Sequence, residues 1–187
     1  MMRPVRLLPK PNTKTASPNN SFVFLIMQKI HNPFRTRKGY KCFGCSPDHP
    51  TGLQMSFFVD GDEIVSTWEP NPEFEGYHGV LHGGIQATIM DEIASYVTYV
   101  KVKVAGVTSS INVRYYKPIY MGGGSVTVRS KLLQMRRNLA DIEVKIYNQE
   151  NELCSEALVT YFTFSEKRSK EEFYYPGAEA FLKDDQS

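Results

Sequence analysis

The sequence predicts an α+β fold in which an antiparallel β-sheet wraps around one long, central helix. A helical period over residues 84–100 interrupts a chain whose other patterned segments have β character. Four β-like segments follow that helix, joined by short polar or glycine-rich stretches. Connections this short join antiparallel strands, because parallel neighbours need a crossover of a dozen or more residues. We therefore expect the element order β-β-α-β-β-β-β.

Turn residues separate the expected strands. Before the helix, residues 53–59 alternate apolar and more polar side chains, Asp60-Gly61-Asp62 supplies a turn, and residues 64–68 continue as a second strand. After the helix, the expected strands cover residues 107–116, 125–133, 139–148 and 153–164. This pattern predicts a hairpin, a helix and a four-stranded meander in one sheet.

The helix carries an apolar arc wider than a surface helix requires, which predicts that it is mostly buried. The remaining narrow stripe consists of small or polar residues: Gly84, Thr88, Asp91, Ser95 and Thr98. Such a stripe is compatible with contact to solvent. It is equally compatible with close approach of a partner or a cleft, because short side chains leave room.

Length and composition indicate one domain with flanking segments. The 187 residues, 41 % hydrophobic and 22 % charged, suffice for one packed core. We expect a disordered tail over 1–30, the folded domain over 41–166 and a C-terminal extension over 167–187. No apolar run reaches the roughly 18 residues of a membrane-spanning helix. Three cysteines cannot form a disulfide scaffold, which favours a reducing compartment and a cytoplasmic location.

The charge distribution argues against nucleic-acid binding. Segment 1–41 contains nine Lys or Arg residues and no Asp or Glu, whereas the rest of the chain contains 13 basic and 20 acidic residues. The patterned part of the chain is therefore acidic. A nucleic-acid-binding domain concentrates positive charge on its ordered surface instead.

The chemistry of the chain concentrates in residues 75–84, which contain four glycines directly before the helix. Glycine allows a ligand to approach the backbone closely, and the first N–H groups of a helix are free donors at its positive end. This arrangement suits an anion, or a carbonyl that becomes one. The alternative is purely structural: Gly83-Gly84 forms a tight turn and His82 is a satisfied polar residue.

One family resemblance favours the functional interpretation. His82-Gly83-Gly84, followed nine residues after the histidine by Asp91, is similar to the signature of hotdog-fold acyl-CoA thioesterases, in the branch named for phenylacetyl-CoA thioesterase. Segments 74–77 and 42–45 resemble a subgroup of that branch, and the similarity covers residues 41–164. The resemblance implies the hotdog fold and hydrolysis of an acyl-CoA thioester.

The resemblance also implies roles for individual residues. The Gly84 N–H, with that of Gly83, would polarise the thioester carbonyl, His82 would shape the turn, and Asp91 would act as nucleophile or general base. Thr108 would position the attacking water. The residues implied in coenzyme A binding are Tyr115, Tyr116, Lys117, Pro118 and Arg137. One departure is that an asparagine found before the histidine in some members is replaced by Gly76 or Tyr77.

The implied partners are the acyl-CoA substrate and a second copy of the chain, as a dimer or a dimer of dimers. About 10 Å of helix separate Gly84 from Asp91, too far for one small reacting centre. A site shared between two subunits, as the family implies, would solve this. We expect no metal and no cofactor beyond the coenzyme A of the substrate.

Several alternatives stay open. Glu92 is a rival acid, although a structural or ion-pair role is its default because it projects 100° away from Asp91. Cys42 and Cys45, with His49 nearby, are compatible with half of a zinc site, a redox pair or a reduced structural pair. Rival functions are a non-catalytic acyl-CoA-binding protein and an acyl-thioester dehydratase or hydratase, the latter pairing His78 or His82 with Asp91.

Overall fold

The computed structural model describes residues 27–183. Its strands are β1 (Gln28–Ile30), β2 (Phe57–Asp60), β3 (Glu63–Trp68), β4 (Glu75–Tyr77), β5 (Val80–Leu81), β6 (Gly106–Tyr115), β7 (Val126–Arg136), β8 (Leu139–Tyr147) and β9 (Leu153–Thr163). The α-helices are α1 (Gly83–Val97), α2 (Glu166–Glu171) and α3 (Glu179–Leu182). Shorter helical turns are η1 (Pro33–Thr36), η2 (Pro72–Phe74) and the π-helical η3 (Thr98–Val102).

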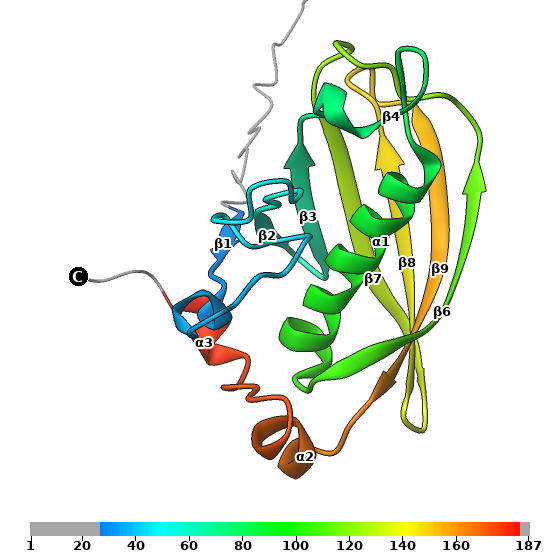
Figure 1. The fold of residues 1–187 in the computed structure, drawn as a ribbon. Helices are drawn as coiled ribbons and strands as arrows, with labels where there is room; N and C mark the ends of the chain where they lie inside the picture. Colours follow the sequence, from blue (N-terminus) through cyan, green and yellow to red (C-terminus); the bar gives the residue numbers. More distant parts are fainter. Residues whose placement is uncertain (1–26, 184–187) are drawn as a thin grey trace, which may run out of the picture.

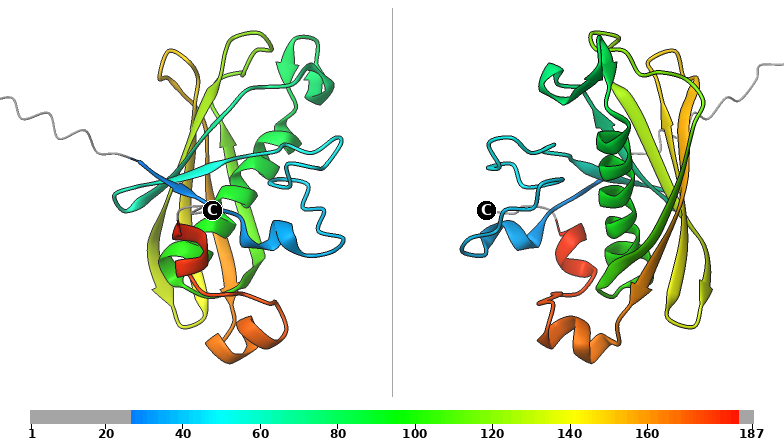
Figure 2. Two further views of the ribbon diagram at one scale, coloured as in Figure 1. Left: turned by 90° about the vertical axis from the view of Figure 1, so that its left-hand side faces the viewer. Right: turned by 45° about the vertical axis from the view of Figure 1, so that its right-hand side comes forward.

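One antiparallel sheet and one long helix form the body of the molecule. The seven strands follow the order β1-β2-β3-β7-β8-β9-β6, and each pairs antiparallel with its neighbours. Helix α1 crosses the concave face of this sheet (Figures 1 and 2). The predicted architecture is therefore confirmed, with β1 and the small β4–β5 hairpin as additional strands.

The core lies between α1 and the sheet. Ile89, Met90 and Ile93 of the helix are fully buried, as are Val128 and Ile142 of the sheet. Burying the wide apolar arc of the helix against the sheet supplies the main hydrophobic stabilisation, at roughly 1.5–3 kcal/mol for each large apolar side chain.

Element boundaries differ from the sequence prediction in three places. The first strand, expected over residues 53–59, is formed only by β2 (Phe57–Asp60); Leu53 and Met55 are buried, which explains the alternating pattern, but they lie outside the strand. The helix continues from α1 through the π-helical turn to Val102, two residues beyond the predicted end. Strand β7 extends to Arg136, so that only Arg137 and Asn138 connect it to β8. Arg137 adopts a left-handed backbone conformation with φ 58°, which closes this tight turn.

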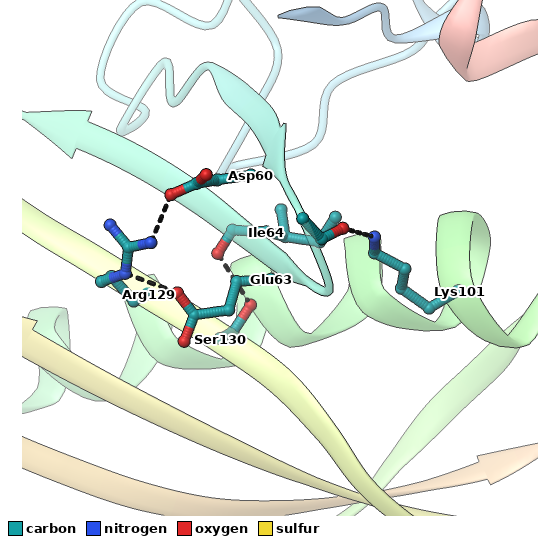
Figure 3. A network of polar contacts seen from close by, with 7 residues as sticks. Asp60, Glu63, Ile64, Lys101, Arg129 and Ser130 are labelled. Atoms are coloured by element: carbon teal, nitrogen blue, oxygen red, sulfur yellow. Dashed lines mark hydrogen bonds and ion pairs between the residues drawn. The ribbon is translucent and has the colours of Figure 1, made fainter. Parts of the chain in front are cut away.

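Charged side chains hold the β2–β3 hairpin against the rest of the sheet (Figure 3). The Arg129 guanidinium on β7 forms ion pairs with Asp60 and Glu63, the latter with Nε 2.6 Å from Oε2. At the turn of the hairpin, the Lys101 ammonium donates to the Gly61 carbonyl at 2.8 Å. The hairpin is thus fixed both to the sheet and to the end of the long helix.

The two terminal segments of the described chain lie against each other beside α1 (Figure 1). Strand β1 falls within the range expected as a tail, and the His31 N–H next to it donates to the Phe181 carbonyl of α3 at 2.8 Å. Phe181 is fully buried and stacks on Tyr99. The remainder of the expected tail, residues 1–26, lies outside the described residues. Within residues 27–183, no helix has the length and apolarity needed to cross a membrane.

Candidate active site

The start of α1 is organised by His82. Strands β4 and β5 lead the chain to this residue, whose Nδ1 accepts a hydrogen bond from the Gly84 N–H at 2.8 Å. Its carbonyl accepts from the N–H groups of Ile85 and Gln86 at 3.0 and 3.1 Å. Within the described chain, the Gly83 N–H donates to no acceptor. His82 is therefore the N-cap of the helix, and Gly83 carries the free donor.

The backbone packs closely around His82 and leaves little room for a side chain at Gly76. A Cβ at Gly76 would stand 2.9 Å from the Cα and from the ring Cδ2 of His82, so glycine is needed for the hairpin to lie against the imidazole. An open hollow of about 340 Å³ adjoins this point. Its lining consists of Glu73, Phe74, Glu75, His82, Gly84, Ile85 and Thr88.

Asp91, two turns along the helix, is held by two hydroxyl groups. The Thr108 hydroxyl on β6 donates to Asp91 Oδ1 at 2.6 Å, and the Tyr161 hydroxyl on β9 donates to the same oxygen at 3.0 Å. Tyr161 also donates to the Asp91 carbonyl at 2.9 Å. Oδ2 accepts no hydrogen bond from any described residue. One carboxylate oxygen is thus held by two hydroxyl groups, and the other has no hydrogen-bond partner among the described residues.

Tyr161 was not among the predicted site residues. Thr108 and Tyr161 are paired across β6 and β9, and this register brings both to the same helix residue. Burial raises the pKa of the Tyr161 phenol above its usual value, so the hydroxyl remains a neutral donor to the carboxylate. The sequence shows only that Tyr161 belongs to a strand, and strand pattern alone does not fix register.

The residues implied in substrate binding lie in two separate places within one chain. Tyr115, at the far end of β6 from Thr108, donates from its hydroxyl to the Gly83 carbonyl at 2.8 Å. Tyr116 hydrogen-bonds Glu156, Lys117 pairs with Glu152 at 2.7 Å, and Pro118 follows on the exposed surface. Arg137, by contrast, lies in the β7–β8 turn, at the Thr108 end of the sheet.

These two places are far apart. Seven residues of extended strand separate Thr108 from Tyr115, roughly 20 Å at 3.3 Å per residue. Along the helix, the glycine turn at Gly84 and the carboxylate residue Asp91 are about 10 Å apart. One chain does not bring the donor groups and the carboxylate to a single reacting centre.

Strand β6 forms an open edge of the sheet. It pairs with β9 on one side and with no described strand on the other. Nearly all of its residues are exposed, including the apolar Val107 and Ile111, which are 45 % and 37 % accessible. Thr108 belongs to this strand, so Asp91 lies directly behind an edge that can pair with another chain.

The neighbouring acid, Glu92, has different surroundings. The Cys42 sulfur lies 3.4 and 3.3 Å from its two carboxylate oxygens. Burial raises the pKa of Glu92 to about 8, and a hydrogen bond from the Cys45 thiol lowers the pKa of Cys42 to about 5. The cysteines are free, and His49 lies outside this cluster, with its Nδ1 accepting from the Thr51 N–H at 3.3 Å. Of the structural or ion-pair role expected for Glu92, no ion pair is formed within residues 27–183, and its contacts are with Cys42.

No histidine of the described chain contacts Asp91. The exposed His78 lies 3.3 Å from the Glu75 carboxylate, and the His82 imidazole is engaged by the Gly84 N–H. The His–Asp pairing imagined for a dehydratase or hydratase is therefore absent within one described chain.

Comparison with known proteins supports a thioesterase relationship. Residues 78–155 match the Thioesterase superfamily. Among curated proteins, “Putative esterase SSO1253” of Saccharolobus solfataricus is 30 % identical over 93 residues, which cover 49 % of this chain. The chain spans only 61 % of the length of that relative.

Solved structures share the fold. The protein smu.793 of Streptococcus mutans, bound to acetyl-CoA, superimposes with a TM-score of 0.57 at 18 % identity, over 70 % of this chain and 98 % of the other. A hypothetical thioesterase of Streptococcus pneumoniae with coenzyme A gives a TM-score of 0.53 at 24 % identity, over 56 % and 83 %. With its antiparallel sheet wrapped around one long helix, this chain has the hotdog fold.

Proposed function

We propose that this protein hydrolyses an acyl-CoA thioester to the free acid and coenzyme A, with Asp91 as its catalytic carboxylate. The observation that carries the proposal is the Asp91 side chain itself: two hydroxyl groups fix Oδ1, and Oδ2 is left unpaired. An acid held in this way, behind an open sheet edge, is oriented for reaction with a group arriving from outside the chain.

In the general-base route, Asp91 Oδ2 takes a proton from water while the water oxygen attacks the thioester carbonyl carbon. The carbonyl becomes a tetrahedral oxyanion, which the N–H groups of Gly83 and Gly84 stabilise. The Gly84 N–H becomes available when the carbonyl oxygen displaces the His82 imidazole from it. Collapse of the intermediate breaks the C–S bond, and the departing thiolate takes the proton from Asp91. In the nucleophilic route, Oδ2 attacks the carbon directly and the C–S bond breaks, which expels the coenzyme A thiolate and leaves an acyl-enzyme anhydride. Water then hydrolyses this anhydride, releasing the free acid and restoring the Asp91 carboxylate.

The working unit in this proposal is a dimer, alone or as half of a tetramer. Asp91 of one subunit faces the glycine turn of its partner, since the two groups of one chain are about 10 Å apart. The exposed edge strand β6 supports this arrangement, because an unpaired strand with exposed apolar side chains is a template for pairing with a second copy.

Coenzyme A recognition is assigned to the residues that the family resemblance implies. Lys117 and Arg137 supply positive charge for the phosphates, and Tyr115 and Tyr116 supply exposed rings. Tyr115 lies at one end of β6, and Arg137 lies in the β7–β8 turn near the other end of that strand, so the two groups would bind one substrate molecule only if two subunits contribute. In this proposal the reaction uses no metal and no cofactor other than the coenzyme A of the substrate. We place the protein in the cytoplasm because its three cysteines are free, which suits a reducing compartment.

The test is release of coenzyme A thiol from short, medium, long and aromatic acyl-CoAs by the wild type, Asp91→Asn and Asp62→Asn. Asp62 is an exposed acid in the β2–β3 turn and controls for the change of charge. Turnover should fall by about 10² to 10⁴ in Asp91→Asn and persist in Asp62→Asn. Intact acyl-CoA binding without turnover by the wild type would refute the proposal in favour of a binding protein. Hydration or dehydration of an acyl thioester without thiol release would refute it in favour of the other enzyme class.

A further inference from the structure

The loop before β2 and the middle of α1 bring three metal-binding side chains together, away from the carboxylate oxygen used in the proposed reaction. We propose that Cys42, Cys45 and Glu92 form a structural site for a thiophilic divalent cation, of which Zn²⁺ is the best fit. The ligand atoms of these three residues all lie within 4.8 Å of one another. This cluster is called the Cys–Cys–Glu cluster below.

The spacing fits a common tetrahedral centre. Zn–S bonds of about 2.3 Å and Zn–O bonds of about 2.0–2.2 Å at tetrahedral angles place sulfur and oxygen ligands roughly 3.5 Å apart. The Cys42 sulfur lies 3.3 and 3.4 Å from the Glu92 oxygens. Two thiolates with one carboxylate select zinc over magnesium or calcium, which prefer oxygen ligands alone.

The surroundings of the sulfur atoms resemble an outer coordination shell. The Cys45 sulfur lies 2.9 Å from the Tyr40 hydroxyl and 3.3 Å from the Asn32 amide nitrogen, so two hydrogen-bond donors can support it as a thiolate. A cavity of about 190 Å³ adjoins the cluster, with Cys42, Cys45 and Glu92 in its wall. This volume admits a water molecule as the fourth ligand.

The local backbone is shaped to bring Glu92 to the cysteines. Gly44 lies between the two cysteines in sequence, and a Cβ there would stand 2.4 Å from the Glu92 Cδ and Oε2. Glu92 also lacks a positive partner: no Lys, Arg or His of residues 27–183 forms an ion pair with it. Partly buried carboxylates are normally paired or bound to metal. A Cys42–Cys45 disulfide would leave Glu92 without either, whereas a cation uses all three groups.

Such a cation would fasten the loop to the helix one residue beyond Asp91. The bound cation is surrounded by two thiolates and one carboxylate, and the protons that these three groups hold in the free protein are released on binding. Because the ligands come from segments 50 positions apart in the chain, binding should stabilise the folded state over the unfolded one. The role proposed for the metal is structural and is independent of the proposed hydrolysis.

The experiment uses the full, untagged chain, reduced and stripped of metal with a chelator. Elemental analysis after addition of Zn²⁺ and removal of excess gives the stoichiometry, and titration with Co²⁺ reports thiolate ligation through its near-ultraviolet charge-transfer absorption. We expect one ion per chain, a thiolate–cobalt band and a higher melting temperature with Zn²⁺. Cys154→Ala is the matched control, because Cys154 is the one cysteine of the described chain outside the cluster.

The variants separate ligation from folding. Cys42→Ser and Cys45→Ser should weaken Zn²⁺ binding by more than about 100-fold, and Glu92→Gln, which preserves shape, should weaken it by at least about tenfold. Gly44→Ala keeps all three ligands but displaces the Glu92 carboxylate, and should also weaken binding. Less than about one-tenth of a zinc ion per wild-type chain, or equal affinity in the wild type and Cys42→Ser, would overturn the proposal. A Cys42–Cys45 disulfide that remains after treatment with reductant would also overturn it.

Discussion

The free donor at the helix start is tested by replacing Gly83 with proline. Gly83 is the first residue of α1, a position where proline is well tolerated because its fixed φ suits the helix. The preceding residue, His82, has φ −57° and ψ 131°, which is the extended conformation that a residue before proline prefers. The substitution therefore deletes the N–H with little change to the backbone.

The expected effect follows from the role of that N–H. Loss of one oxyanion donor lowers kcat by about 10² to 10³, or about 2.7–4 kcal/mol. The reference is Gly83→Ala, which adds a side chain and keeps the N–H. A Cβ at this position would lie 3.4 Å from the Tyr115 ring, an ordinary contact, so both variants meet the same neighbour. The ratio of their activities isolates the donor.

The assay is steady-state thiol release on the preferred acyl-CoA, with melting temperatures measured in parallel. Gly83→Pro should turn over at least about 100-fold more slowly than Gly83→Ala, while both melt within a few degrees of the wild type. Equal turnover by the two variants would show that the Gly83 N–H does not stabilise the transition state. The reasoning from free donors at the helix start would then be wrong.

Three further predictions concern the carboxylate, the sheet and the edge strand. Thr108→Val and Tyr161→Phe each remove one hydroxyl donor to Asp91 Oδ1, and each should lower kcat about tenfold or more with only a small change in melting temperature. A loss confined to stability would contradict the positioning role. The Arg136 guanidinium holds the pKa of the buried Asp141 carboxyl below its usual range. The ionised Asp141 therefore stabilises the fold fully at pH values above about 3.9, the pKa of Asp in the unfolded chain, and progressively less as the pH falls below that value. Asp141→Ala should therefore cost roughly 2–3 kcal/mol in urea unfolding at neutral pH and clearly less near pH 3; a cost that does not change with pH would refute this account. Ile111→Lys places a charge on the exposed edge strand and should give a folded monomer by light scattering with little turnover, whereas an intact, active dimer would rule out pairing through β6.

The fold was predictable because its signals are local. The change from strand to helical period at Gly84 and back near Val107 locates the one long helix, and its wide apolar arc indicates burial. The small β4–β5 hairpin was missed because three- and two-residue strands are too short to show a period. The extension of β7 to Arg136 was missed because the two-residue turn depends on a left-handed backbone conformation at Arg137. Glycine or asparagine at that position would have indicated such a turn in the sequence, whereas arginine does not.

The candidate site was predictable only in its helix residues. His82 and Asp91 follow from a local motif. Thr108 was expected to position the attacking water, and the contact of its hydroxyl with Asp91 Oδ1 at 2.6 Å is found only in the folded chain. The contribution of Tyr161 depends on the pairing of β6 with β9, which includes an irregularity between Thr108 and Ser110. A shift of one residue in that register would turn Tyr161 to the other face of the sheet.

Asp91 and Glu92 are adjacent acids whose surroundings could not be predicted from the sequence. Their 100° separation on the helix predicts that the two acids point to different surroundings, and they do. What each meets is decided elsewhere: Asp91 by strands that follow the helix, Glu92 by a loop that precedes it by 50 residues. The sequence motif identifies the acid, but only the folded chain assigns a hydroxyl-bound carboxylate to one position and a thiol-bound carboxylate to the next. The two sites are adjacent in sequence and chemically distinct, which is why metal content and thioester turnover can be tested separately.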